Sequence, residues 1–175
     1  KSSAASDVNK RQPLNGVVRV DGQAYRFMGI TLETLAPMAD EKAWTGRYTT
    51  SAPSGNAWTK PDFDDSSWLE GKAAWGGGDD NYTDIGTKWQ GEGADIWVRR
   101  TVTLSEIDAT ADYYATYKHD DTFELYVNGQ LVLSTGYTWD VSGQSVKVNR
   151  NLLHEGTNVI ACLLYTSPSP RDYAA

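Results

Sequence analysis

Three side chains suited to chemistry stand next to one another in the sequence, at His119, Asp120 and Asp121. We refer to these three residues as the acidic cluster. Its two carboxylates could bind Ca²⁺, which prefers oxygen ligands, or could accept hydrogen bonds from sugar hydroxyls. Tyr137 and Trp139 follow a short way along the chain and could stack an aromatic ring on the face of a sugar. In this interpretation the cluster is a ligand-binding site.

The acidic cluster also has a structural interpretation. One of its aspartates would cap backbone amides where a strand begins, and another would pair with Arg99 or Arg100. Asp65 and Trp68, in the segment FDDSSW, join these two arginines in an expected structural clamp, with the tryptophan as an anchor that packs a loop. The sequence leaves both interpretations open.

A second group of carboxylates lies at Asp79, Asp80 and Asp84, after three consecutive glycines that let the backbone pass close to another segment. These side chains could supply oxygen ligands for Ca²⁺. Their spacing does not match an EF-hand loop, and the bidentate glutamate of such a loop is absent. Ca²⁺ is nevertheless the one cofactor that the sequence suggests.

Other kinds of chemistry find little support. The chain of 175 residues has only two histidines and one cysteine, and it has no G-x-S-x-G motif. Zinc sites and phosphate-binding loops are not supported by its motifs either. A pair of carboxylates for glycoside hydrolysis could be drawn from Asp120, Asp121 and Glu124. An accessory domain would account for the same carboxylates without catalysis.

The composition and the length of the apolar runs argue against two classes of partner and leave a third open. Asp and Glu number 23 against 16 for Lys and Arg, so the net charge of −7 argues against binding nucleic acid. No apolar run approaches the roughly 20 residues that a membrane span requires. The chain has 7 Trp and 10 Tyr but only 3 Phe, which suits a carbohydrate-facing surface as well as the core of a β-sandwich.

The elements that must position these residues are short strands. Residues 122–127 alternate apolar and polar side chains, Asn128-Gly129 predicts a type I′ turn, and residues 130–133 begin a return strand. A second hairpin is predicted over 14–29, around Asp21-Gly22. Residues 95–104 should place Arg100 on the apolar face of a strand, where it would need a buried partner or a bulge.

Further strands are predicted at 111–118, 141–148 and 158–161, with Gly- and Asp-rich turns and no convincing amphipathic helix. This pattern predicts an all-β fold, an antiparallel β-sandwich of the jelly-roll type.

The segments FDDSSW, DIWVRRTVTL, HDDTFELYVNGQLV and EGTNVIA, in this order, resemble the galactose-binding-like jelly-roll module. That module accompanies many bacterial glycoside hydrolases, including the family 2 β-galactosidases. The resemblance implies a non-catalytic accessory domain that packs against a catalytic region of the same parent chain. It also leaves an alternative, an autonomous carbohydrate-binding module that could depend on Ca²⁺. Val102 stands where the module usually has Phe, a departure at a core position.

The N-terminal part carries a second resemblance. The segment PLNGVVRVDGQAYRFMG, followed by LETLAPMADEKAWTGRYT, is similar to the amino-terminal region of secreted glutaminase A-like proteins of Bacteroidota. In those proteins a jelly roll and then a large helical region follow. The two resemblances together cover residues 13–161. They imply a secreted or periplasmic location and a hydrolase as the parent protein.

The C-terminal segment CLLYTSPSPRD, residues 162–172, matches neither the predicted strand pattern nor the pattern of the family. It resembles the translation of a sequencing-library adapter, so Cys162 would have no biological role and the closing strand of the sandwich would be missing. The expected division is therefore a flexible N-terminus at 1–13, a hairpin and connector at 14–43, a sandwich at 44–161 and a non-native tail at 162–175.

Overall fold

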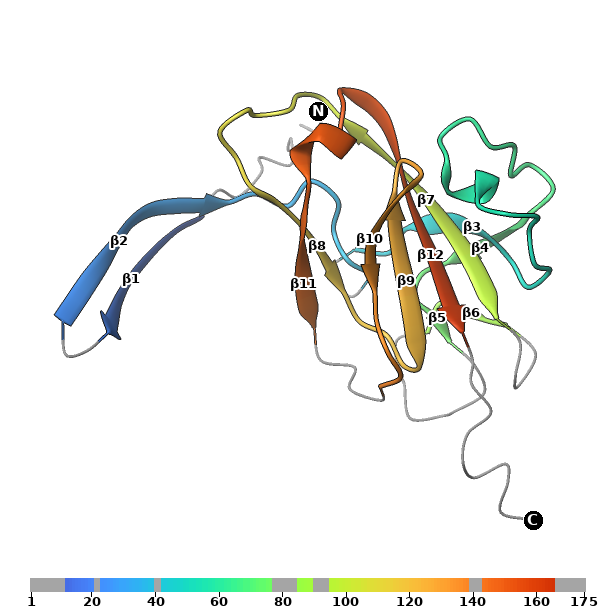
Figure 1. The fold of residues 1–175 in the computed structure, drawn as a ribbon, viewed down its shortest axis with the longest axis horizontal. Coiled ribbons are helices and arrows are strands. Elements are labelled where there is room, and N and C mark those ends of the chain that lie inside the picture. The colour runs from blue at the N-terminus through green and yellow to red at the C-terminus, as the bar shows by residue number, and fades with distance from the viewer. Residues whose placement is uncertain are drawn as a thin grey trace, which may run out of the picture. The chain divides into compact units, whose positions relative to one another are not determined.

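The computed structural model describes residues 12–20, 23–39, 42–76, 85–89, 95–138 and 143–165. The chain divides into two compact units, residues 1–37 and residues 38–175. The first unit is a hairpin of β1 (Gln12–Val20) and β2 (Gln23–Leu32), which pair antiparallel with Val20 opposite Gln23 (Figure 1). The predicted turn at Asp21-Gly22 lies outside the described residues.

The second unit is built on a six-stranded sheet in the order β10-β9-β12-β7-β3-β4, with every neighbouring pair antiparallel. A two-stranded antiparallel sheet, β11-β8, contacts it at β10. The described strands of the second unit are β3 (Thr45–Thr49), β4 (Leu69–Lys72), β5 (Trp75–Gly76), β6 (Thr87–Lys88), β7 (Ile96–Leu104), β8 (Tyr113–Tyr117), β9 (Thr122–Val127), β10 (Gln130–Ser134), β11 (Gln144–Val148) and β12 (Gly156–Tyr165).

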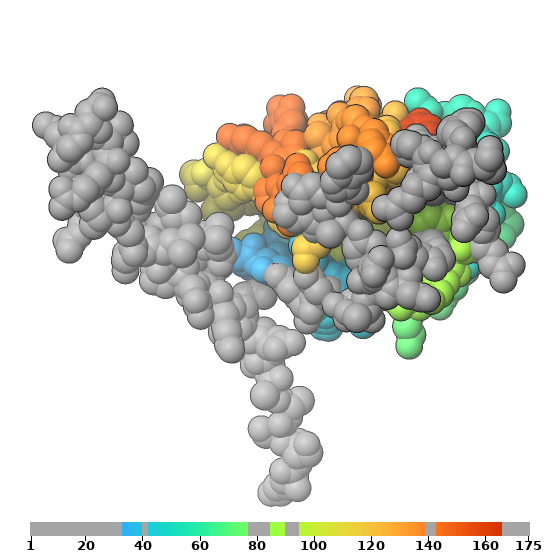
Figure 2. Space-filling view, turned by 90° about the horizontal axis from the view of Figure 1, so that it is seen from below, coloured from blue at the N-terminus to red at the C-terminus, as the bar shows by residue number. Residues whose placement is uncertain are grey.

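The predicted fold class is confirmed. The second unit is an antiparallel β-sandwich, and among its described strands only the short pair β5–β6 runs parallel. Within the described part of the chain the helices are two single 3₁₀ turns, η1 (Ala57–Thr59) and η2 (Arg150–Leu152). Figure 2 shows the described residues of this unit as one close-packed body.

The central strands bury side chains on both faces of the large sheet, because alternate residues of a strand point to opposite sides. On one face Trp97, Tyr126, Val159, Ala161 and Leu163 pack with Trp58 from the loop before β4. On the other face the core consists of Trp89, Ile96 and Val98, with Tyr48, Trp75, Cys162 and Leu164 packed against it. Strands β7 and β12 therefore each contribute to two cores.

The hairpin at the end of β9 has the predicted turn. Asn128 has a φ of 49° and Gly129 a φ of 87°, so both central residues take the positive φ that a type I′ turn requires. The pairing of Val127 with Gln130 closes the hairpin around these two residues. The turn prediction is confirmed.

The last strand extends beyond its predicted end at Ala161. Strand β12 continues to Tyr165, and Cys162 lies opposite Val98 on one side and Leu125 on the other. The prediction that the strand pattern stops at 161 is therefore wrong. The reason is that Cys162, Leu163 and Leu164 alternate between the two cores as a strand requires. The adapter origin of residues 162–172 stays a prediction.

The two arginines of β7 lie on the predicted faces of the strand. Arg99 is 5% exposed on the face of Trp97, whereas Arg100, on the face of Ile96 and Val98, is half-buried. The guanidinium of Arg100 lies 4.3 Å from the centre of the Trp44 ring, and burial lowers its pKa. An aromatic face, rather than a bulge, accommodates the arginine on this side.

Candidate functional site

His119, the first residue of the acidic cluster, is part of the core. Its side chain is only 7% exposed, and its ring stacks on Phe123 at 5.0 Å and on Tyr117 at 5.7 Å between centroids. Its Nδ1 lies 3.1 Å from the backbone oxygen of Asp121. Aromatic packing from β8 and β9 and this polar contact together fix the imidazole in place at the start of β9.

Asp120 and Asp121 shape the chain where β9 begins. The backbone N–H of Asp121 donates to Asp120 Oδ1 at 2.9 Å and to the oxygen of Thr138 at 2.6 Å. Asp121 itself has a φ of 67°, a left-handed conformation that Asp tolerates better than most residues. Burial, and then the charge of Asp120, raise the pKa of the Asp121 carboxyl. One aspartate of the cluster thus caps a backbone amide, while the other is held beside a like charge.

Of the two aromatic residues expected beside the acidic cluster, the structure describes Tyr137 and not Trp139. Tyr137 is 47% exposed and directly precedes Thr138, whose carbonyl accepts the Asp121 N–H. An accessible ring therefore lies in the same segment as a backbone partner of the cluster. Trp139 lies outside the described residues.

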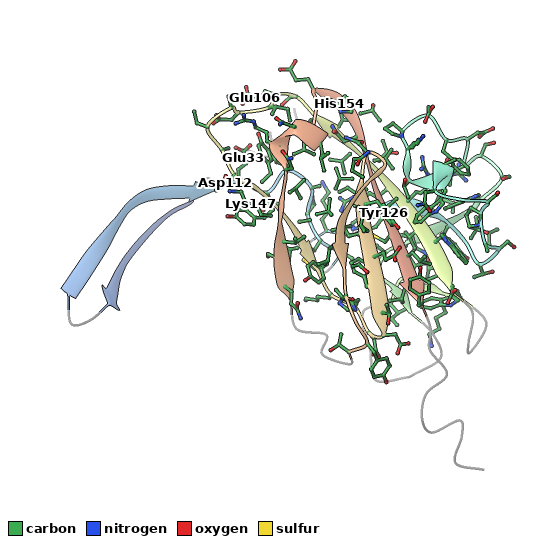
Figure 3. The ribbon with its side chains drawn as sticks, viewed as in Figure 1. Glu33, Glu106, Asp112, Tyr126, Lys147 and His154 are labelled. Atoms are coloured by element: carbon green, nitrogen blue, oxygen red, sulfur yellow. The ribbon has the colours of Figure 1, made fainter. Side chains whose placement is uncertain are left out.

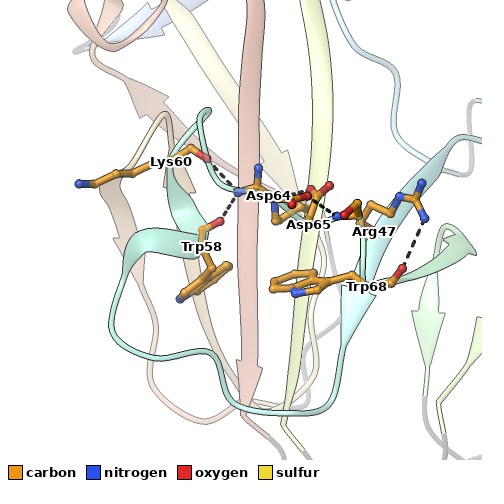
Figure 4. Close-up of polar contacts among 8 residues, drawn as sticks. Arg47, Trp58, Lys60, Asp64, Asp65 and Trp68 are labelled. Atoms are coloured by element: carbon orange, nitrogen blue, oxygen red, sulfur yellow. Dashed lines mark hydrogen bonds and ion pairs between the residues drawn. The ribbon is translucent and has the colours of Figure 1, made fainter.

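Arg99 pairs with Asp65, a second member of the expected clamp (Figure 4). Of the two arginines expected as partners of the acidic cluster, Arg99 therefore has its acidic partner in another loop. Arg99 Nε donates to Asp65 Oδ2 at 2.6 Å, and Arg99 Nη1 donates to the backbone oxygens of Lys60, at 3.0 Å, and of Trp58. The arginine faces the loop between β3 and β4, so this loop supplies the acceptors. Asp65 reaches Arg99 because the Asp-Asp-Ser-Ser turn folds over β7.

Aromatic rings complete this clamp. The Arg99 guanidinium lies 5.2 Å from the centre of the Phe63 ring, and Phe63 packs edge-on against Trp68 at 5.7 Å. Trp68 also contacts Trp58 at 6.4 Å between centroids, and its carbonyl accepts a hydrogen bond from Arg47. The clamp therefore holds the loop between β3 and β4 onto one face of the sheet.

A third polar group, which the sequence did not reveal, closes the other end of β9. Asn158 is 2% exposed, and its Oδ1 accepts hydrogen bonds from Asn128 Nδ2 at 2.8 Å and from the N–H of His154 at 3.2 Å. Its Nδ2 donates to the backbone oxygens of His154 and Gly156. A buried asparagine within EGTNVIA has no pattern that distinguishes it in the sequence. The one partner of Asn158 that the sequence indicated as structurally important is Asn128, through the predicted hairpin turn.

Glu124 accepts hydrogen bonds from two phenols on the sheet. Tyr126, labelled in Figure 3, donates to Glu124 Oε2 at 2.6 Å, and Tyr165 donates to Oε1 at 3.4 Å. Burial, followed by the contact with Glu124, raises the pKa of the Tyr126 phenol. This carboxylate joins β9 to β12.

An open hollow lies at the end of the small sheet. Asp112 and Lys147, adjacent in Figure 3, form an ion pair at 2.8 Å, and the Tyr114 ring nearby is 59% exposed. The hollow has a volume of about 410 Å³ and is lined by Ala111, Asp112, Tyr113, Lys147, Val148, Asn149 and Arg150. In the sequence, residues 111–113, 147 and 148 were predicted strand positions, and none of the residues lining the hollow was a candidate site residue.

The proposed Ca²⁺ ligands Asp79, Asp80 and Asp84 lie outside the described residues. Among the residues that are described, no group of three or more His, Cys, Asp or Glu is arranged to hold a metal ion. Burial raises the pKa of the Cys162 thiol to about 12, so this cysteine is a thiol packed in the sheet. No helix in the described part of the chain is both long and apolar enough to cross a membrane.

No family model and no curated protein matches the sequence. Among solved structures, a β-glycosidase from Bacteroides vulgatus has a similar fold, with a TM-score of 0.53 and 17% identity over 71% of this chain. A glycosyl hydrolase family 2 member from Bacteroides cellulosilyticus DSM 14838 has a TM-score of 0.53 and 13% identity over 70% of this chain. In both cases the match covers 17% of the other protein. At these identities the likeness concerns the fold, a β-sandwich that occurs in glycoside hydrolases.

Proposed function

We propose that this chain is a non-catalytic accessory β-sandwich of a larger hydrolase, in which it packs against and orients a catalytic region. The observation that carries this proposal is the fold likeness to two glycoside hydrolases of which the matched part is only 17%. In this proposal the domain makes up a small part of the parent protein and has no activity of its own, and it contributes by holding the larger catalytic region in position. Fold alone does not imply function, so the local chemistry must agree.

The carboxylates of the sandwich support an accessory role. Glycoside hydrolysis uses two carboxyl groups that face each other across a substrate, roughly 5–9.5 Å apart. Here Asp65 is paired with Arg99, and Glu124 accepts a hydrogen bond from Tyr126. Asp120 caps a backbone amide. Each of these carboxylates already has a partner that maintains the fold.

The class of the parent protein is part of the proposal. The N-terminal resemblance favours a glutaminase A-like parent, and the fold likeness favours a glycoside hydrolase-like one. A secreted or periplasmic location is part of the proposal and is supported by the N-terminal resemblance. Long-read sequencing of the source gene past the codon for Ala161 would decide, because it would reveal a helical glutaminase-like region, a glycoside hydrolase region or neither.

The accessory role is tested by activity. The purified chain should release no product from a panel of aryl glycosides or from glutamine, and the parent protein should lose thermal stability when residues 38–161 are deleted. Turnover by the isolated chain that disappears in the variant D120A/D121A would refute the proposal. So would a parent protein whose stability and kinetics are unchanged by the deletion.

A second candidate function, carbohydrate binding, is favoured by two exposed rings. Tyr137 adjoins a partner of the acidic cluster, and Tyr114 stands near the Asp112–Lys147 pair. An accessible ring beside paired polar groups suits the apolar face and the hydroxyls of a pyranose. Calorimetric titration with oligosaccharides, with and without Ca²⁺, should give binding that Y137A or Y114A abolishes. No heat with any sugar would eliminate this candidate and leave the accessory role intact.

A further inference from the structure

The chain contains two Asn-Gly dipeptides, Asn15-Gly16 and Asn128-Gly129. In this dipeptide the glycine nitrogen can attack the side-chain amide carbon of the asparagine, because glycine has no side chain in the way. A bond forms between the glycine nitrogen and Cγ, the Cγ–Nδ2 bond breaks, and ammonia leaves with the glycine proton. Water then opens the succinimide to aspartate or isoaspartate.

The folded protein holds the Asn128 amide by both of its ends. Asn128 Nδ2 donates to the backbone oxygen of Leu152 at 2.7 Å and to Asn158 Oδ1 at 2.8 Å. Asn128 Oδ1 accepts the N–H of Val159 at 2.8 Å. The attack by Gly129 requires the amide to rotate and the turn to change shape, so these bonds must break first.

We propose that Asn128 is a deamidation site whose reaction is gated by folding. The amide is protected while the β9–β10 hairpin is docked on the loop before β12, and it reacts when that contact opens. Local openings of this kind cost less free energy than global unfolding and therefore occur in the native protein.

The product cannot restore the network. A carboxylate at position 128 would direct an acceptor at the oxygens of Leu152 and Asn158, which are themselves acceptors. A buried acceptor without a donor loses the hydrogen bond and its solvation together. Isoaspartate would in addition lengthen the backbone within a two-residue turn. Each opening that ends in reaction therefore removes a molecule from the native population.

Asn15-Gly16 supplies an internal reference in the same chain. Its backbone lies in β1, which belongs to the other unit and shows a register irregularity between Leu14 and Gly16. The full chain would be incubated in mildly alkaline buffer, folded or in urea, and both sites followed by peptide mapping and isoaspartate detection. Asn128 should react at least about tenfold more slowly in the folded chain than in urea. Equal rates at Asn128 in the two conditions would overturn the proposal.

A variant tests whether the network itself provides the protection. N158A removes one acceptor of the Asn128 amide and should accelerate deamidation of Asn128 in the folded chain. N151A is the matched control, since Asn151 is exposed and bonds only Asn149 through its backbone N–H. An N158A chain that folds, by circular dichroism, and reacts no faster than N151A would contradict the proposal. If N158A does not fold, the wild-type comparison between folded chain and urea decides.

Discussion

Strand β9 ends at both sides in a residue with positive φ, Asp121 at its start and Asn128 after its last residue, but the two ends are organised differently. Around Asn128 every described donor of the side chain meets an acceptor and its oxygen meets a donor. Around Asp121 a carboxyl lies half-buried next to a second carboxyl, and its pKa is raised. The polar groups around Asn128 are paired with complementary partners, whereas at the other end the Asp121 carboxyl lies beside a like charge.

The difference separates structural from functional chemistry. A buried polar group with complementary partners stabilises one conformation and leaves nothing for a ligand. A strained residue with an unfavourable charge costs stability, so it persists either because it forms part of a site or because the surrounding structure holds it. The acidic cluster is therefore the better place to look for a ligand, and the Asn128 end is the better place to look for stability.

The clamp at Arg99 tests whether the pairing of a polar group, rather than its burial, decides what its loss costs in stability. D65A removes the carboxylate from a guanidinium that is almost fully buried, and we expect the free energy of unfolding to fall by about 2 kcal/mol. This loss is smaller than for a fully buried ion pair because Asp65 is partly exposed. The double variant R99M/D65A should recover part of this loss, since no charge is left unpaired. Urea titration measures both.

D64A serves as the control for this clamp. Asp64 adjoins Asp65 in Figure 4, but its carboxylate accepts hydrogen bonds from the N–H and the hydroxyl of Ser66, in an exposed turn. Its removal should cost less than about 1 kcal/mol. A cost for D64A equal to that of D65A would show that the turn, and not the ion pair, stabilises the loop.

At the matched end, the contrast between N128D and N128G isolates the hydrogen bonds from the turn. Both residues tolerate the positive φ, but N128D places a carboxylate against two acceptors. We expect unfolding free energy to fall by about 3 kcal/mol in N128D and about 2 kcal/mol in N128G at neutral pH. Acidification should restore N128D selectively, because a protonated carboxyl can donate. If the two variants melted alike at every pH, the network would have no role beyond the turn.

How far the sequence predicts this fold depends on the range of the interactions. The β9–β10 hairpin is encoded locally, by alternation and by Asn128-Gly129, and it was predicted correctly. Strands β3 and β4 were missed because they lie in a Gly- and Asp-rich stretch. Their pairing, such as Arg47 opposite Arg99, joins residues far apart in the chain. Local patterns carry no information on such partners.

The polar sites show the same limit. The sequence identified Arg99 and Asp65 as clamp residues but gave the arginine a partner in the acidic cluster as well, because nothing local says where the loop folds. His119 was singled out for its chemistry, and the structure places it in an aromatic stack with Phe123. Asn158 could not be singled out, because its four hydrogen bonds depend on tertiary contacts.

Glu124 and Asp121 lie close together in the sequence, but substitutions that remove their interactions should change the stability of the protein in opposite directions. Glu124 has phenol donors, so Y126F should destabilise the protein by about 1 kcal/mol, with one oxygen left to Tyr165 and solvent. The melting temperature of Y126F should fall while its far-UV circular dichroism stays unchanged. A variant as stable as the wild type would mean that this short hydrogen bond only replaces an equally good one to water.

The smallest change in stability is expected for a substitution of Asp121. The informative result is whether this substitution raises or lowers the stability. Because the pKa of Asp121 is raised in the folded chain above its ordinary value of 3.8, the folded state binds the proton more tightly than the unfolded state does. This contribution to stability is present below pH 3.8 and is lost as the pH rises through the raised pKa. D121N keeps a residue that tolerates positive φ and removes the charge, so it should be slightly more stable at neutral pH, by about 0.5 kcal/mol or less.

The pH dependence distinguishes this explanation from a general effect of the substitution. Wild type and D121N should have similar stability in acid and diverge as the pH rises, whereas D120A should lose stability because it removes the acceptor of the Asp121 N–H. If D121N is less stable than the wild type at neutral pH, the carboxylate has a favourable partner. The acidic cluster would then belong with the matched clusters at Arg99 and Asn128, and the search for a ligand would move to the exposed rings of Tyr114 and Tyr137.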